Sequence, residues 1–107
     1  KKVNPNAIIL LTTPADFFKR KTHRNPGVRT IRDKIIKAAT TSHLPYWNLY
    51  EVAGGNHSAD RWKKWGLLQS DGIHFTPNGY DLQGQLLFDA IVKGYNEYVR
   101  NRLSKTH

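Results

Sequence analysis

The order of three segments constrains the fold more than any other feature of the sequence. Residues 7–12 form an apolar run rich in β-branched side chains, which is typical of a strand buried on both faces. Between residues 28 and 40, apolar side chains recur at helical spacing and predict a helix with one buried face. Residues 46–52 predict a second strand, which Gly54-Gly55 ends. Strand, helix and strand in this order imply a right-handed crossover and a parallel sheet.

The segments that flank this strand–helix–strand unit are predicted from their glycine, proline and charged residues. Residues 16–27 are rich in charge and predict a loop with one helical turn around residues 15–19. Residues 54–76 show no strand period and predict a long loop or a short helix, a length that is unusual unless it serves a purpose. Four apolar side chains are expected to anchor this segment: Trp62, Trp65, Leu67 and Leu68.

A long C-terminal helix is predicted to begin at Thr76-Pro77, with threonine as the N-cap and proline in the first turn. It runs to about Leu103. Gly84 and Gly94 each weaken it by roughly 1 kcal/mol relative to alanine, so close packing is expected at both. Its apolar face is expected to carry Tyr80, Leu87, Ala90, Ile91, Tyr95 and Tyr98.

Length and composition favour one small domain. The chain has 107 residues and no methionine, and its charged start leads almost at once into the first apolar run, so we expect a piece of a longer protein. No stretch approaches the roughly 20 apolar residues that span a bilayer, so no membrane span is expected. The absence of cysteine excludes disulfides and cysteine-bound zinc. No cofactor and no metal site are expected.

The net charge of +9 leaves two interpretations open. One is a non-catalytic basic module that binds nucleic acid or an anionic polymer. The other is a solvated face, because much of the charge falls on a loop and one side of the first helix. We favour the second interpretation and expect no nucleic-acid partner.

One pair of residues could carry acid–base chemistry. Asp71 and His74 lie in a glycine-containing loop before the last helix, beside a parallel sheet of the kind that places sites at its edge. In an acyl-transfer triad, a histidine takes the proton of a serine while a carboxylate on its other ring nitrogen orients it. The alternative is that Asp71 caps a turn and His74 packs under the helix.

The segment from Asp71 to Tyr80, Asp-Gly-Ile-His-Phe-Thr-Pro-Asn-Gly-Tyr, resembles the last block of the SGNH, or GDSL-type, hydrolases. In that family an Asp-x-x-His pair is followed by a small residue, a Gly-Tyr and a long helix. Residues 7–14 resemble the strand after the family's asparagine block, and residues 46–55 resemble its last strand. Residues 62–69 resemble the segment before the histidine block in bacterial members, including those thought to deacetylate glycans.

The resemblance implies a fragment of a flavodoxin-like three-layer α/β/α sandwich, with two parallel strands and two main helices. It implies that residues 1–107 are the C-terminal part of a single hydrolase domain. His74 would be the general base and then the general acid, and Asp71 its orienting carboxylate. The nucleophilic serine and the oxyanion glycine and asparagine are not recognisable here, so the isolated chain is expected to be inactive.

The same resemblance implies a serine esterase acting on a small acyl ester or an acetylated glycan, in the periplasm or outside the cell. The upstream part of the same enzyme would be its partner. His57 would touch substrate if its loop lines the cleft, although a solvated histidine is the commoner case. Trp62 and Trp65 could stack on a sugar, although aromatic anchors are commoner, and Asp16 and Asp60 are expected to be surface charges.

Overall fold

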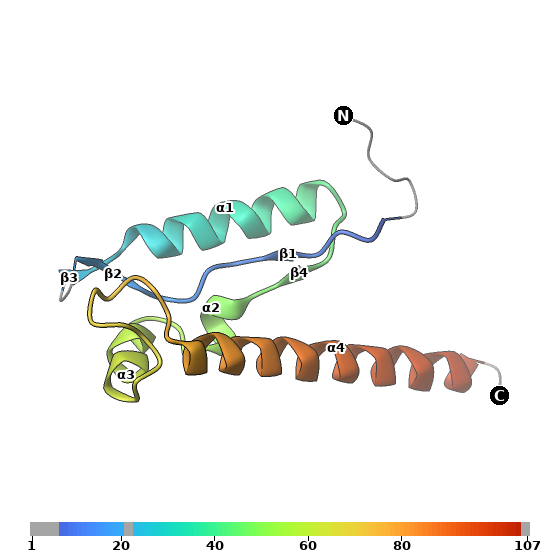
Figure 1. The fold of residues 1–107 in the computed structure, drawn as a ribbon. Coiled ribbons are helices and arrows are strands. Elements are labelled where there is room, and N and C mark those ends of the chain that lie inside the picture. The colour runs from blue at the N-terminus through green and yellow to red at the C-terminus, as the bar shows by residue number, and fades with distance from the viewer. Residues whose placement is uncertain (1–6, 21–22, 106–107) are drawn as a thin grey trace.

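The computed structural model describes residues 7–20 and 23–105. Their elements follow the chain as shown in Figure 1. The strands are β1 (Leu11–Thr12), β2 (Phe18–Arg20), β3 (His23–Arg24) and β4 (Tyr46–Trp47). The helices are α1 (Gly27–Thr41), α2 (Leu49–Val52), α3 (Ser58–Lys64) and α4 (Pro77–Lys105).

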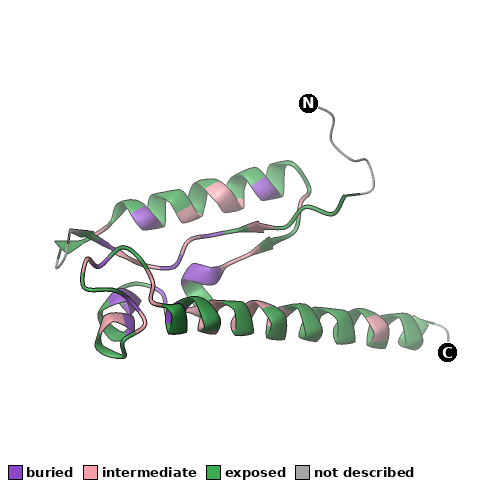
Figure 2. Ribbon diagram, viewed as in Figure 1, coloured by how far each residue is buried: buried purple, intermediate pink, exposed green. Residues whose placement is uncertain are grey.

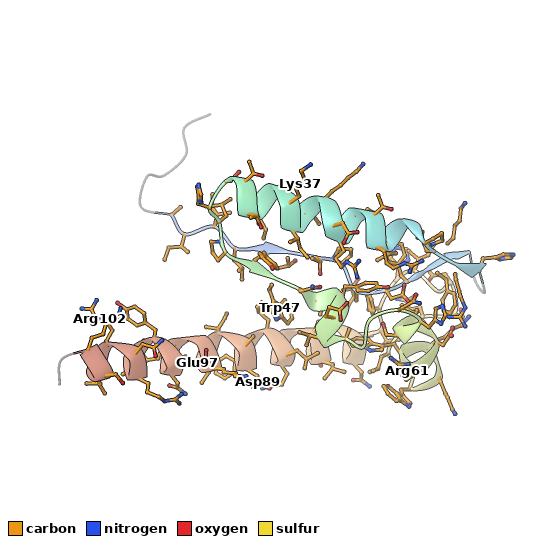
Figure 3. All side chains as sticks on the ribbon, turned by 180° about the vertical axis from the view of Figure 1, so that it is seen from behind. Lys37, Trp47, Arg61, Asp89, Glu97 and Arg102 are labelled. Atoms are coloured by element: carbon orange, nitrogen blue, oxygen red, sulfur yellow. The ribbon has the colours of Figure 1, made fainter. Side chains whose placement is uncertain are left out.

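The parallel sheet and its two covering helices form three layers. β1 pairs with β4 in parallel, with Leu11 opposite Tyr46 and Thr12 opposite Trp47. α1 runs along one side of this pair and α4 along the other (Figure 1). Figure 3 shows the Trp47 side chain in the space between β4 and α4. The prediction of an α/β fold with two parallel strands, two main helices and a long C-terminal helix is confirmed.

The second strand is shorter than predicted. It ends at Trp47, and residues 49–52 form the helix α2. The Asn48 side chain accepts a hydrogen bond from the Glu51 backbone N–H at 3.2 Å, so it caps this helix. The prediction of a strand over residues 46–52 is therefore wrong in its second half. Asparagine followed three residues later by glutamate is a helix-start pattern that the alternation of apolar residues obscured.

The segment after β1 is extended rather than helical. The turn predicted around residues 15–19 is absent, and β2 pairs with β3 in an antiparallel ribbon. Phe18 is buried against Ala59, Trp62 and Leu68, and its backbone N–H donates to the Gly72 carbonyl at 2.8 Å. Both contacts join residues that are far apart in the sequence, so local patterns did not predict this segment.

The helical predictions agree closely with the structure. The helix predicted over residues 28–40 is α1, and the helix predicted from Thr76 is α4. Thr76 Oγ1 accepts from the Gly79 N–H at 3.1 Å, as an N-cap does. Within the long loop, Trp62 and Leu68 are buried anchors, whereas Trp65 is 61% exposed and anchors nothing.

The core lies at one end of the molecule, and the sheet edge and much of α4 are bare. In Figure 2 the exposed class covers most of α4. Ile8 is 92% exposed, so the prediction that residues 7–12 are buried on both faces is wrong for the chain as described. Nothing lies near an added Cβ at Gly84 or Gly94, which also contradicts the expected close packing there. A sheet of two strands is too narrow to cover the apolar faces of both α1 and α4.

None of the helices among the described residues is both long enough and apolar enough to cross a bilayer.

Candidate functional site

Asp71 and His74 form a hydrogen-bonded pair. His74 Nδ1 lies 2.6 Å from Asp71 Oδ2. The other carboxylate oxygen, Oδ1, accepts from the backbone N–H groups of Ile73 at 2.9 Å and His74 at 3.0 Å. Asp71 therefore caps its own turn with one carboxylate oxygen and contacts the His74 imidazole with the other. The alternative in which His74 packs under the helix is excluded, because its side chain is 67% exposed.

The electrostatics of the pair favour an ionised carboxylate. The hydrogen bond to His74 is the largest cause that lowers the pKa of Asp71, followed by the two backbone N–H groups, and together they bring it to about 2. At neutral pH Asp71 is therefore a carboxylate. When the ring carries its proton on Nδ1, the pair leaves Nε2 free to accept a proton, which is the arrangement that a general-base histidine needs.

The loop that holds the pair is tied to the body on both sides. Gly72 has a positive φ of 74°, a conformation that costs glycine little. Its carbonyl accepts the bond from Phe18 on β2. Gln69 N–H donates to the His74 carbonyl at 2.8 Å, and Leu68 pairs with Phe75 as an isolated antiparallel bridge. The turn is therefore held by backbone contacts on each flank.

The start of α4 closes against this loop at Gly79. A Cβ on Gly79 would lie 2.0 Å from the Leu67 carbonyl oxygen, so no other residue fits without movement of the backbone. Thr76 Oγ1 donates to the Gly66 carbonyl at 2.8 Å while it caps the helix. Phe75 stacks edge-on with Trp62 and with Tyr80, at centroid distances of 5.6 and 5.7 Å. These contacts place the helix directly beyond His74.

An apolar cavity of about 600 Å³ adjoins the loop that carries the pair. Residues 12–15 line it at the end of β1, Ile31 and Ile35 line it from α1, and Tyr80 and Gln83 line it from α4. Ile73, between Asp71 and His74, also lines it. Gln83 Nε2 is buried without a hydrogen-bond acceptor in the described structure. An unpaired buried donor costs free energy. We therefore interpret this cavity as a surface that another polypeptide segment would cover.

His57 lies apart from the pair. It has a positive φ of 68° and precedes α3, and it lines a separate polar pocket of about 230 Å³. Asp16 lines the same pocket. Asp16 is half-buried rather than a free surface charge, and it accepts from the Ala59 N–H at 3.2 Å. The sequence alone did not single out Asp16, because its burial depends on α3, which follows more than forty residues later.

The described residues contain no hydroxyl group hydrogen-bonded to the His74 ring. Within the same ranges there is no cluster of histidine and acidic side chains that could hold a metal ion. Part of the basic charge is paired: Arg24 lies 2.7 Å from Asp60, and Arg32 contacts Asp33 and Glu51. Figure 3 shows other charged side chains, such as Lys37, extending from the outer surface of the helices.

Comparisons with known proteins show a likeness of fold. No protein-family model matches the chain, and no curated protein matches it. A solved structure of a peptidoglycan O-acetylesterase superposes with a TM-score of 0.80 and 22% sequence identity. The match covers 87% of this chain and 28% of that one. The chain thus shares the fold of one part of that structure and spans little more than a quarter of its length.

Proposed function

We propose that this chain is the C-terminal portion of an SGNH-type serine esterase and supplies the histidine base and its aspartate. The observation that carries the proposal is the 2.6 Å contact between His74 Nδ1 and Asp71 Oδ2, with the far side of the ring exposed. The sequence resemblance of residues 71–80 and the fold of the peptidoglycan O-acetylesterase both support it. An O-acetylated glycan is the substrate class that we propose.

The proposed reaction is ester hydrolysis, in which His74 carries the proton between the reacting groups. A serine from another segment would attack the ester carbonyl as His74 Nε2 takes its proton, and His74 would return that proton to the departing alcohol oxygen. Water would then attack the acyl-enzyme with the same base, which releases the acid and restores the serine. Asp71 would remain ionised and stabilise the imidazolium throughout.

The remainder of the catalytic domain is the proposed partner, and the open edge of β1 is its proposed docking site. The N–H groups of Leu11 and Thr13 donate to Pro45 and Trp47 at 3.1 and 3.0 Å. In a parallel sheet alternate residues bond to opposite neighbours, so the backbone of Leu10 and Thr12 faces the free edge. A strand from that remainder, paired with the free edge of β1, would fill the adjoining 600 Å³ cavity. If this strand runs parallel to β1, its carboxyl end would lie beside His74.

The test uses the chain expressed together with the upstream part of its parent protein, and the release of acetate from a model ester is measured. His74→Ala is expected to lower kcat by about 10⁴-fold or more, as removal of a triad base does. His43→Asn is the matched control, since His43 lies between α1 and β4, away from the pair, and its positive φ of 55° suits asparagine. Unchanged turnover in His74→Ala would refute the proposal.

A further inference from the structure

A second pocket lies beside residues 15–18, the segment that is bonded to the Asp71–His74 loop through Phe18. Ala15 and Phe17 line the apolar cavity beside Ile73, whereas Asp16, between them, lines the polar pocket. Two residues further on, Phe18 is bonded to Gly72 in the Asp71–His74 loop. Two residues of extended chain span ~7 Å, so the polar pocket and the pair are neighbours along one segment.

Six residues with planar polar side chains line this pocket of about 230 Å³: Asp16, Arg24, Asn25, Arg29, Asn56 and His57. They come from four separate parts of the chain, namely the segment between β1 and β2, β3 with the turn after it, α1, and the turn before α3. The lining is therefore assembled by the tertiary fold and is not one run of charged residues.

Much of the hydrogen-bonding capacity in this pocket is uncommitted. Asp16 uses Oδ2 for Ala59, which leaves Oδ1 available. Asn25 Oδ1 accepts from Gly27 N–H at 3.1 Å, and its amide N–H groups have no acceptor within residues 7–20 and 23–105. Arg24 is held in place by Asp60. Partial burial of the Asp16 carboxyl raises its pKa above the ordinary value, and the hydrogen bond from Ala59 opposes this shift.

This set of groups suits a sugar better than an ion. Each sugar hydroxyl both donates and accepts, so it is matched by a carboxylate or amide oxygen beside an amide or guanidinium N–H. The pocket offers both kinds at once. A simple anion would meet the Asp16 carboxylate, and a cation would meet Arg24 and Arg29.

We propose that this pocket is a glycan subsite, which binds a sugar unit next to the one whose ester faces His74. The inference rests on the proposed esterase function and extends it, because it assigns recognition of the sugar chain to residues outside the Asp71–His74 loop. A short oligosaccharide would run from this pocket past residues 16–18 toward the Asp71–His74 loop, to which Phe18 is bonded.

The experiment measures binding of an N-acetylglucosamine trimer by ¹H–¹⁵N NMR titration to the ¹⁵N-labelled chain, expressed together with the upstream part of its parent protein. Chemical-shift changes are expected at Asp16, at residues 24–29 and at Asn56 and His57. Asn56→Ala and Arg29→Ala are each expected to weaken binding by about fivefold or more, which is the loss expected for one hydrogen bond. Circular dichroism shows whether each variant keeps the fold.

Asn96→Ala and Arg100→Ala are the matched controls, because they remove the same side chains from the surface of α4. Both are expected to bind the trimer as the unaltered chain does. Equal affinity in all four variants, or shifts confined to other residues, would overturn the subsite. His74→Ala separates the two proposals: it should bind the trimer normally, whereas loss of hydrolysis in that variant tests the esterase function alone.

Discussion

At the scale of single residues, the state of Asp71 is set by its neighbours in the loop. It accepts three hydrogen bonds, one from the His74 ring and two from backbone N–H groups. The spacing of Asp71 and His74, their place before the last helix and the family resemblance together predicted that they could meet. They do meet, because Asp71 accepts from Ile73 and His74 in the turn around Gly72. The bond from Phe18 to Gly72 then ties this turn to β2, a contact that no pattern within the loop specifies.

The ionisation of Asp71 provides a prediction at this scale. Its folded pKa of about 2 lies below the ordinary value of 3.8, so its stabilising contribution is present above pH ~4 and is lost as the pH falls through about 2. NMR titration of the Asp71 carboxyl carbon should give a midpoint near 2. In His74→Ala the midpoint should rise, because the largest cause is removed. An unchanged midpoint would contradict the ring's part in lowering this pKa.

At the scale of elements, the approach of α4 to the Asp71–His74 loop depends on the absence of a side chain at Gly79. The sequence indicated a helix start at Thr76 and a Gly-Tyr after it, but it did not show what the glycine accommodates. The structure shows that the Leu67 carbonyl occupies the place of a Cβ. The first turn of the helix and the loop carrying His74 are thus packed as one unit.

Substitution of two glycines in the same helix tests this packing. Gly79→Ala should destabilise the fold by a few kcal/mol, since a contact of 2.0 Å forces the backbone apart. Gly84→Ala, with open space around it, should stabilise the helix by roughly 1 kcal/mol. Chemical denaturation measures both. Equal effects of the same sign would show that α4 does not approach Leu67 closely.

At the scale of the whole molecule, the described chain has more apolar surface than one sheet and two helices can cover. Phe88 is 62% exposed and Tyr95 is 66% exposed on α4. A second groove, between β4 and α4, is lined by Leu10, Trp47 and Ile91 among others. Trp47 Nε1 is buried there without an acceptor among the described residues. Exposed apolar patches and open sheet edges favour association.

We therefore expect the isolated chain to self-associate or to be only marginally stable. Sedimentation velocity across a concentration series should show oligomers, and Ile91→Lys should reduce them because it places a charge in the apolar groove. Asn96→Lys adds the same charge on another side of α4 and should change little. A monomer with a high melting temperature would contradict this expectation.

The sequence by itself determined the elements whose signals are local. Helical periodicity identified α1, the Thr-Pro cap identified the start of α4, and the apolar runs identified where β1 and β4 lie, because each signal depends on residues within a few positions. Only the tertiary structure decided the rest. Residues 15–20 are extended because Phe18 packs on α3 and bonds to Gly72. Asp16 lines a pocket with His57 because it accepts a hydrogen bond from Ala59 on α3. Contacts between distant segments outweigh local propensity there. The Asp71–His74 pair itself is made by hydrogen bonds within one turn, and the tertiary contacts hold that turn against the body.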